Sequence, residues 1–68
     1  MAAACYRFVV RGALGRLYAS AFEGMQIDFD GEVSTIVGPI GDQAQLQGLL
    51  MRIASLGLEL VSVTRVDL

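Results

Sequence analysis

The sequence predicts a small α+β protein, in which one main helix packs on a four-stranded, mostly antiparallel sheet. Three observations support this class. A clearly patterned strand, helix and strand occupy Thr35 to Asp67, an alternating strand opens the chain, and two further alternating runs flank Asp30 and Gly31. With 68 residues, we expect a single domain over residues 1–68.

The first strand is predicted to end at Gly12. Two sets of residues alternate before that glycine, one of them firmly apolar: Tyr6, Phe8 and Val10 against Arg7, Val9 and Arg11. A period of two is typical of a strand with one buried face. We therefore expect one side of this strand to face the core.

The next segment leaves two folds open. Within residues 14–21 the positions that fit one face of a helix are Leu14, Leu17, Tyr18 and Ala21. The glycines at positions 12, 15 and 24 leave room for at most about ten helical residues. A short helix here gives the order βαββαβ, a minimal ferredoxin-like fold. An irregular crossover gives βββαβ instead.

A hairpin is expected to turn at Asp30 and Gly31. A three-residue loop over residues 29–31 places Ile27 opposite Val33, which keeps apolar side chains together better than a two-residue loop does. We expect the second strand of the hairpin to stop at Gly38 and Pro39, because proline cannot donate a hydrogen bond inside a sheet.

The main helix is predicted over residues 43–56. Asp42 stands at the N-cap position and Gln45 completes a capping-box pattern, after which leucine and isoleucine recur on one helical face. Gly57 is placed to end the helix in the left-handed conformation. The run from Leu58 to Val66 is rich in β-formers and predicts the last strand.

The charge pattern narrows the partners. Seven acids stand against five arginines and no lysine, so the net charge is −2 and no basic stripe exists for nucleic acid. Uncharged stretches are too short to span a membrane, and neither a basic segment nor an apolar run precedes Cys5 as in a signal peptide. We expect a cytoplasmic protein that binds neither nucleic acid nor membrane.

The small size predicts self-association. A chain of this length buries only about 60% of the surface its unfolded state exposes. With one cysteine and no histidine, neither a disulfide nor a structural zinc site can compensate, and 54% of the residues are hydrophobic. We expect a homo-oligomer, a dimer or higher. The candidate interface residues, on the bare sheet face and the helix surface, are Val9, Ile36, Gly48 and Met51.

Two arginines and a glycine loop are the candidate ligand-binding residues. Arg7 and Arg11 share one face of the first strand, and Arg65 on the last strand is expected beside them, where they could clamp a carboxylate or phosphate. The alternative is that they pair with Glu59 or with acids of a neighbouring subunit. The loop that follows supplies the remaining candidates, Gly12, Leu14 and Gly15.

No residue pattern points to catalysis, a metal or a cofactor. Acids gather near the hairpin tip, as in a solvated turn, and their spacing does not match an EF-hand loop. Cys5 has no histidine or lysine near it in sequence, and the tyrosines are expected at the edge of the core. A cofactor-free enzyme with a carboxylate or tyrosine base stays a third alternative.

Two resemblances accompany this interpretation. The stretch Val10-Arg11-Gly12-Ala13-Leu14-Gly15, followed by a hairpin, a leucine-rich helix and a valine-rich strand, resembles ACT-type regulatory domains, which bind amino acids between paired subunits. The string from Asp42 to Val63, with Ala21 to Met25 upstream, is similar to short stand-alone bacterial proteins without assigned function. The second resemblance implies a free-standing product and no particular activity.

The leading hypothesis is a non-enzymatic, homo-oligomeric interaction or scaffold protein, because the informative positions are packing positions. The alternative is a small-molecule-binding regulatory module in the ACT manner. It implies a pocket at a subunit interface, lined by the loop from Gly12 to Leu17.

Overall fold

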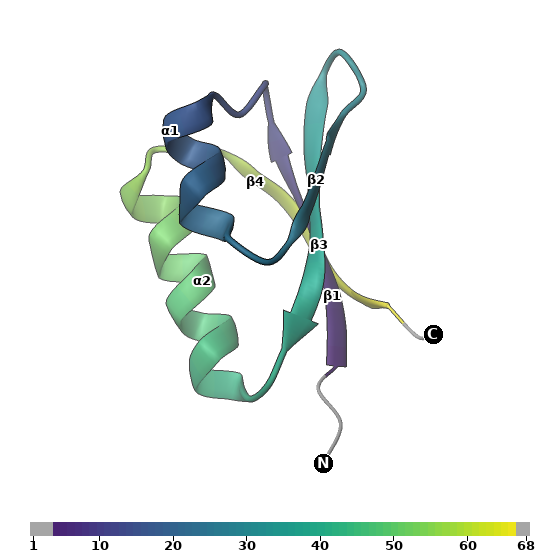
Figure 1. Ribbon diagram of the computed structural model, residues 1–68, viewed down its shortest axis with the longest axis vertical. Coiled ribbons are helices and arrows are strands. Elements are labelled where there is room, and N and C mark those ends of the chain that lie inside the picture. The colour runs from purple at the N-terminus through teal and green to yellow at the C-terminus, as the bar shows by residue number, and fades with distance from the viewer. Residues whose placement is uncertain (1–3, 67–68) are drawn as a thin grey trace.

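The computed structural model describes residues 4–66, except for the side chain of Leu17. Seven elements follow one another along the chain: β1 (Ala4–Arg11), α1 (Arg16–Ala19), the 3₁₀ turn η1 (Ser20–Phe22), β2 (Gln26–Phe29), β3 (Val33–Ile40), α2 (Gln43–Ser55) and β4 (Leu60–Val66). The segment left open by the sequence is helical, so the order is βαββαβ (Figure 1).

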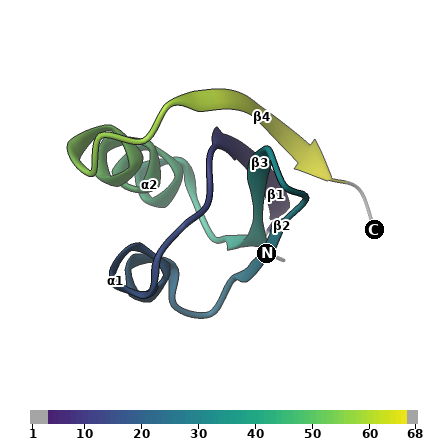
Figure 2. The same ribbon diagram turned by 90° about the horizontal axis from the view of Figure 1, so that it is seen from above.

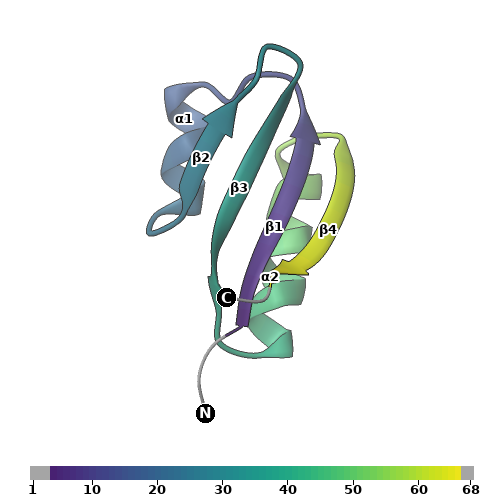
Figure 3. The same ribbon diagram turned by 90° about the vertical axis from the view of Figure 1, so that its right-hand side faces the viewer.

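The four strands form one antiparallel sheet in the order β2-β3-β1-β4. Figure 3 shows this order across one face of the sheet, and Figure 2 shows that both helices lie on the other face. This is the arrangement of a minimal ferredoxin-like fold, as predicted. A bulge between Val9 and Val10 shifts the register of β1 against β4, so that Val9 faces Ser62 and Val10 faces Leu60.

Helix α2 begins and ends as the sequence predicts. The carboxylate of Asp42 accepts a hydrogen bond from the backbone N–H of Gln45 at 2.8 Å, and the Gln45 side chain accepts one from the Gly41 N–H at 2.6 Å. At the other end Gly57 has φ +75°, and Leu58 donates to the carbonyl of Ile53 at 3.2 Å. This is a Schellman ending, so the helix stops at Ser55, one residue short of the predicted boundary.

The first helical segment is much shorter. Helix α1 has four residues, and its N-cap is Gly15, which offers no side chain to the free N–H groups. The segment continues as η1 and ends before Gly24, whose φ of +85° turns the chain towards β2. The glycines limit this helix as the sequence suggested.

The hydrophobic core lies between the helices and one face of the sheet. Alternate residues of β1 and β3 supply most of it, and η1 and α2 close it from above. Its buried members are Phe8, Val10, Phe22, Ile36, Ile40, Leu49 and Ile53. The predicted apolar face of β1 is therefore the core face.

The predicted position of Ile36 on the uncovered face was wrong. Ile36 faces Phe8 across the β1–β3 ladder and is fully buried. Since cross-strand neighbours share a face, this register places Ile36 beneath the helices. It therefore belongs to the core of the monomer rather than to an exposed surface.

The hairpin register also differs from the prediction. Ile27 faces Ile36 and Phe29 faces Ser34, instead of Ile27 facing Val33. The carboxylate of Asp30 accepts hydrogen bonds from the N–H groups of Glu32 and Val33 at 2.8 and 2.9 Å. These bonds fold residues 30–33 into the turn, which shifts the pairing and places two isoleucines opposite each other.

Strand β3 continues through Pro39 to Ile40, beyond its predicted end. Strand β2 has only four residues and pairs with β3 no further than Val37. The last part of β3 is therefore an edge on that side, where a missing N–H costs nothing, while its other side still pairs with β1, Pro39 opposite Cys5.

The longest helix, α2, has 13 residues. A membrane-spanning helix needs about 20. None of the helices within residues 4–66 could cross a membrane. The single domain over residues 1–68 stays a prediction, because the two ends of that range lie outside the described residues.

Candidate functional site

The sheet face opposite the helices, which we call the uncovered face, carries the residues that alternate with the core. At its centre lie Val9, Thr35 and Val37, each half-buried by its neighbours in the sheet. Two exposed charges flank them, Arg7 on β1 and Asp28 on β2. Neither charge forms an ion pair with another residue of the described chain.

The other predicted arginine on this face is already engaged. The guanidinium of Arg11 lies 3.3 Å from the carboxylate of Glu59 and 3.9 Å from that of Glu32. Pairing with Glu59 was the alternative to a ligand clamp. All three side chains are at least half exposed, so these bridges contribute little to stability. They tie the ends of β1, β3 and β4 together.

The third arginine of the expected set does not join the other two. Arg65 faces Tyr6 across the β1–β4 ladder, and Tyr6 lies on the same face of β1 as Phe8. Arg7 lies on the opposite face, opposite Thr64. The expected clamp of Arg7, Arg11 and Arg65 is therefore divided between the two faces of the sheet.

The residues of the predicted glycine loop have structural roles in the chain. Gly12 has φ +92°, its N–H donates to the Glu32 carbonyl at 2.9 Å, and its carbonyl accepts from the Ser34 hydroxyl at 2.6 Å. Leu14 packs against the core, and Gly15 caps α1. Arg11 and Gly12 lie together at the end of β1, whereas Arg7 lies further down the strand. A ligand site on this loop stays a prediction.

The two interface candidates on the helix lie on its solvent side. Gly48 is exposed, and a Cβ at this position would meet nothing within 4 Å. Met51 is 73% exposed. Neither residue packs within the chain, and their role in an interface stays a prediction.

The carboxylate of Asp30 lies at the hairpin tip and accepts hydrogen bonds from the backbone. The hydrogen bonds from the N–H groups of Val33 and Glu32 stabilise the ionised form of Asp30 and lower its pKa below the ordinary value of 3.8. This carboxylate is used by the turn. Within residues 4–66, no group of three or more histidine, cysteine, aspartate or glutamate side chains comes together in a way that could hold a metal ion.

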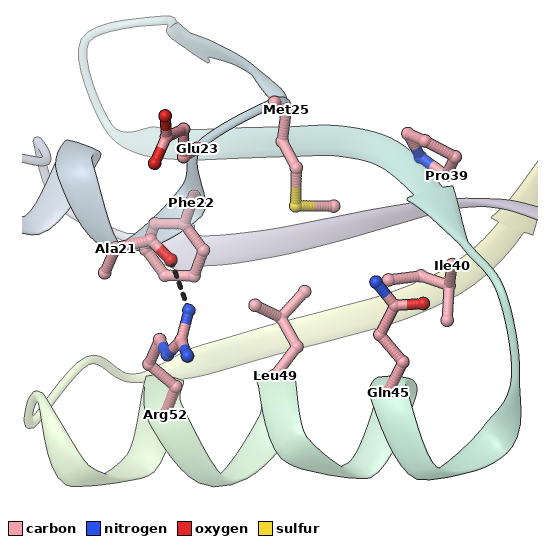
Figure 4. A pocket seen from close by; sticks show the side chains of 10 residues that line it. Ala21, Phe22, Glu23, Met25, Pro39, Ile40, Gln45, Leu49 and Arg52 are labelled. Atoms are coloured by element: carbon pink, nitrogen blue, oxygen red, sulfur yellow. Dashed lines mark hydrogen bonds between the residues drawn. The ribbon is translucent and has the colours of Figure 1, made fainter.

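A cavity that the sequence did not indicate lies between α2 and the segment from Ala21 to Met25. It has a volume of about 340 Å³. We call it the Arg52 cleft (Figure 4). Its lining is Ala21, Phe22, Glu23, Gly24, Met25, Pro39, Ile40, Gln45, Leu49 and Arg52. The cleft lies where the first helical segment ends at Phe22 and the chain turns at Gly24.

The lining of the Arg52 cleft is part apolar and part polar, and its charged and polar side chains are Glu23, Arg52 and Gln45. Phe22, Ile40 and Leu49 belong to the buried core, and Met25 lies across Gly38 of β3. Arg52 Nη1 donates to the Ala21 carbonyl at 2.7 Å at one end, and Gln45 lies at the other (Figure 4). The lining comes from three separate parts of the chain, residues 21–25, the end of β3 and helix α2, so only tertiary structure brings it together.

The fold and surface define a class first: a minimal ferredoxin-like protein with a bare sheet face and a cleft beside its main helix. The model of a family described as a domain of unknown function (DUF8691) matches residues 5–64. The chain belongs to this family. No curated protein and no solved structure matches it. The resemblance to ACT-type domains stays a resemblance.

Proposed function

We propose that this protein is a non-enzymatic interaction protein that associates with a second copy of itself through the uncovered face. The observation that supports this proposal most strongly is the charge pattern there. One base, Arg7, and one acid, Asp28, neither of them ion-paired with another described residue, lie on either side of an apolar centre. Such a face is complementary to itself, as the symmetric interface of a dimer requires.

The geometry allows both charges to be used at once. Arg7 on β1 and Asp28 on β2 are separated by β3, which carries Thr35 and Val37. A two-fold axis that passes over these two residues places Arg7 of one copy against Asp28 of the other, twice. The half-buried valines would then lose their remaining exposure to water, which supplies the apolar core of the interface.

Charge reversal tests this arrangement. We expect Arg7→Asp and Asp28→Arg each to raise the dissociation constant of the dimer by about tenfold or more, because each places two pairs of like charges in contact. The double variant restores opposite charges and should recover most of the affinity. Sedimentation equilibrium measures all four constants on the full chain.

Two results would contradict the proposal. One is a wild-type chain that stays monomeric at every concentration. The other is a dimer that both single variants leave unchanged. As a matched control, Arg16→Asp reverses an exposed arginine on α1, away from the uncovered face, and should leave the dissociation constant unchanged.

A further inference from the structure

We propose that the Arg52 cleft binds a small molecule with a carboxylate group and a short apolar body. This inference goes beyond self-association, because the cleft lies on the helix side of the sheet and the uncovered face lies on the other (Figures 2 and 4). Its volume of about 340 Å³ is at the small end of ligand pockets, which span about 300–1,000 Å³. The size suits a small molecule rather than a dinucleotide.

In this proposal, Arg52 binds the carboxylate group of the ligand. A guanidinium has five N–H donors. Its Nη1 donates to the Ala21 carbonyl at 2.7 Å, which holds the group at the mouth of the cleft. Arg52 forms no ion pair with a described acid, and Figure 4 shows the Glu23 carboxylate directed away from it. A positive group held in place without a counterion favours an anion, and its planar fork matches a carboxylate.

The opposite end of the cleft also offers a donor. The N–H of Gly41 can only donate, so the Gln45 atom that faces it at 2.6 Å must be the carbonyl oxygen. The NH₂ group of Gln45 is therefore turned the other way, towards Met25 and Leu49 in Figure 4. Arg52 and Gln45 both present donors to the cleft, so the ligand must bring acceptors for these two side chains, while the Glu23 carboxylate, also in the lining, is directed away from Arg52.

The body of the ligand must be apolar. Between the two ends, the cleft is lined by Phe22, Met25, Ile40 and Leu49. Phe22, Ile40 and Leu49 are already almost fully buried in the core, so the apolar area that a ligand covers there is small and supplies only part of the affinity. Met25 adds an adaptable wall, since its unbranched thioether can adjust to ligands of different shape. One arginine against this apolar lining suits a single negative charge better than a phosphate.

The test titrates the full chain with hexanoate as the probe and with hexanamide as its neutral counterpart. Binding is measured from the changes in backbone amide chemical shifts. We expect saturable shifts in residues 22–25 and 45–52, with hexanamide binding about tenfold more weakly than hexanoate. In Arg52→Gln, the two probes should bind equally weakly. Equal affinities in the wild type would overturn the assignment of the carboxylate.

A second variant keeps the test valid if loss of the Arg52 hydrogen bond disturbs folding. A Cβ at Gly38 would lie 2.7 Å from Cγ of Met25 and would push that side chain into the cleft. We expect Gly38→Ala to weaken hexanoate binding by about tenfold or more. Gly48→Ala is the matched control, because a Cβ there would meet nothing within 4 Å. It should leave binding unchanged.

Two further outcomes would overturn the proposal. The first is the absence of saturable chemical-shift changes in the cleft at probe concentrations up to about 10 mM, because a site with a weaker dissociation constant than this would not be a specific binding site. The second is a set of shifts that map to Val9, Thr35 and Val37, which would place the probe on the uncovered face. Sedimentation of the same samples measures whether the protein still self-associates. It therefore distinguishes a failure of ligand binding in the cleft from a failure of the proposed dimer.

Discussion

The protein consists of two βαβ units with the same topology, but their helices cover the sheet unequally. In the half β3–α2–β4, a helix of 13 residues has an aspartate cap and two buried anchors, Leu49 and Ile53. In the half β1–α1–β2, the helix has four residues and a glycine cap, and Phe22 of η1 is buried. The same topology therefore leaves one half of the sheet closed and the other partly open.

This difference shows how a few glycines create a candidate site. Gly15 starts the first helix without a side-chain cap, and Gly24 turns the chain away soon after it. The short helix costs core area, and it leaves a cavity beside an arginine that has no counterion within the described chain.

The largest expected effect comes from removing Phe22, the buried anchor of η1. Phe22→Ala should lower the free energy of unfolding by about 3–5 kcal/mol, since Phe22 is only 2% exposed. Amides of residues 16–22 should lose protection in hydrogen exchange first. Tyr18→Ala, on the exposed side of α1, serves as the control and should cost about 1 kcal/mol or less. Equal losses for both variants would contradict the anchor role.

The next effect concerns the cap of the long helix. Asp42→Ala should lower the free energy of unfolding by about 1 kcal/mol, because the Gln45 N–H loses the acceptor it holds at 2.8 Å. Asp42→Ser keeps a capping oxygen and should recover most of this loss. Urea denaturation measures both values. A full loss in the serine variant would mean that the charge, and not the hydrogen bond, is what matters.

The hairpin that joins the two halves should respond to acid through Asp30. Its pKa is lowered in the folded protein by the two backbone hydrogen bonds, so the ionised form favours folding. This contribution is fully present above the ordinary pKa of 3.8 and is lost as the pH falls through the lower, folded value. In acid denaturation, Asp30→Asn should reduce this part of the pH dependence. An unchanged profile below about pH 5 would contradict the role of Asp30.

The smallest expected effect is a gain in the short helix. Gly15→Asp supplies the missing N-cap side chain at a residue with φ −72°, where a Cβ meets nothing within 4 Å. We expect a few tenths of a kcal/mol of added stability. Thermal denaturation measures it as a small rise in the melting temperature. A loss of stability would mean that the first helix cannot use a cap.

The second half could be predicted from the sequence because its signals are local. Asp42, Gln45 and Gly57 lie within one helix and its ends, and each acts on backbone groups close to it in the chain. The alternation of β1 was equally local, and it placed Phe8 and Val10 in the core. The fold class followed from these elements and their order.

The predictions of the hairpin register and of the position of Ile36 were wrong, because both depend on interactions that the alternation of apolar and polar residues does not reveal. The register of the hairpin depends on two hydrogen bonds to the Asp30 carboxylate, and that register decides which face Ile36 occupies. The Arg52 cleft depends on packing between distant segments. One signal was present: Arg52 is the only charged residue within α2. The contact of Arg52 with the Ala21 carbonyl arises only in the folded structure, so this arginine alone does not predict a site.

The most direct test of self-association through the uncovered face is disulfide trapping. In a chain with Cys5→Ser, Thr35→Cys places the only thiol near the expected two-fold axis, and Met51→Cys places it on the solvent side of α2. We predict that mild oxidation converts the Thr35→Cys chain to a covalent dimer much faster than the Met51→Cys chain. Equal rates, or faster trapping at Met51, would contradict the account.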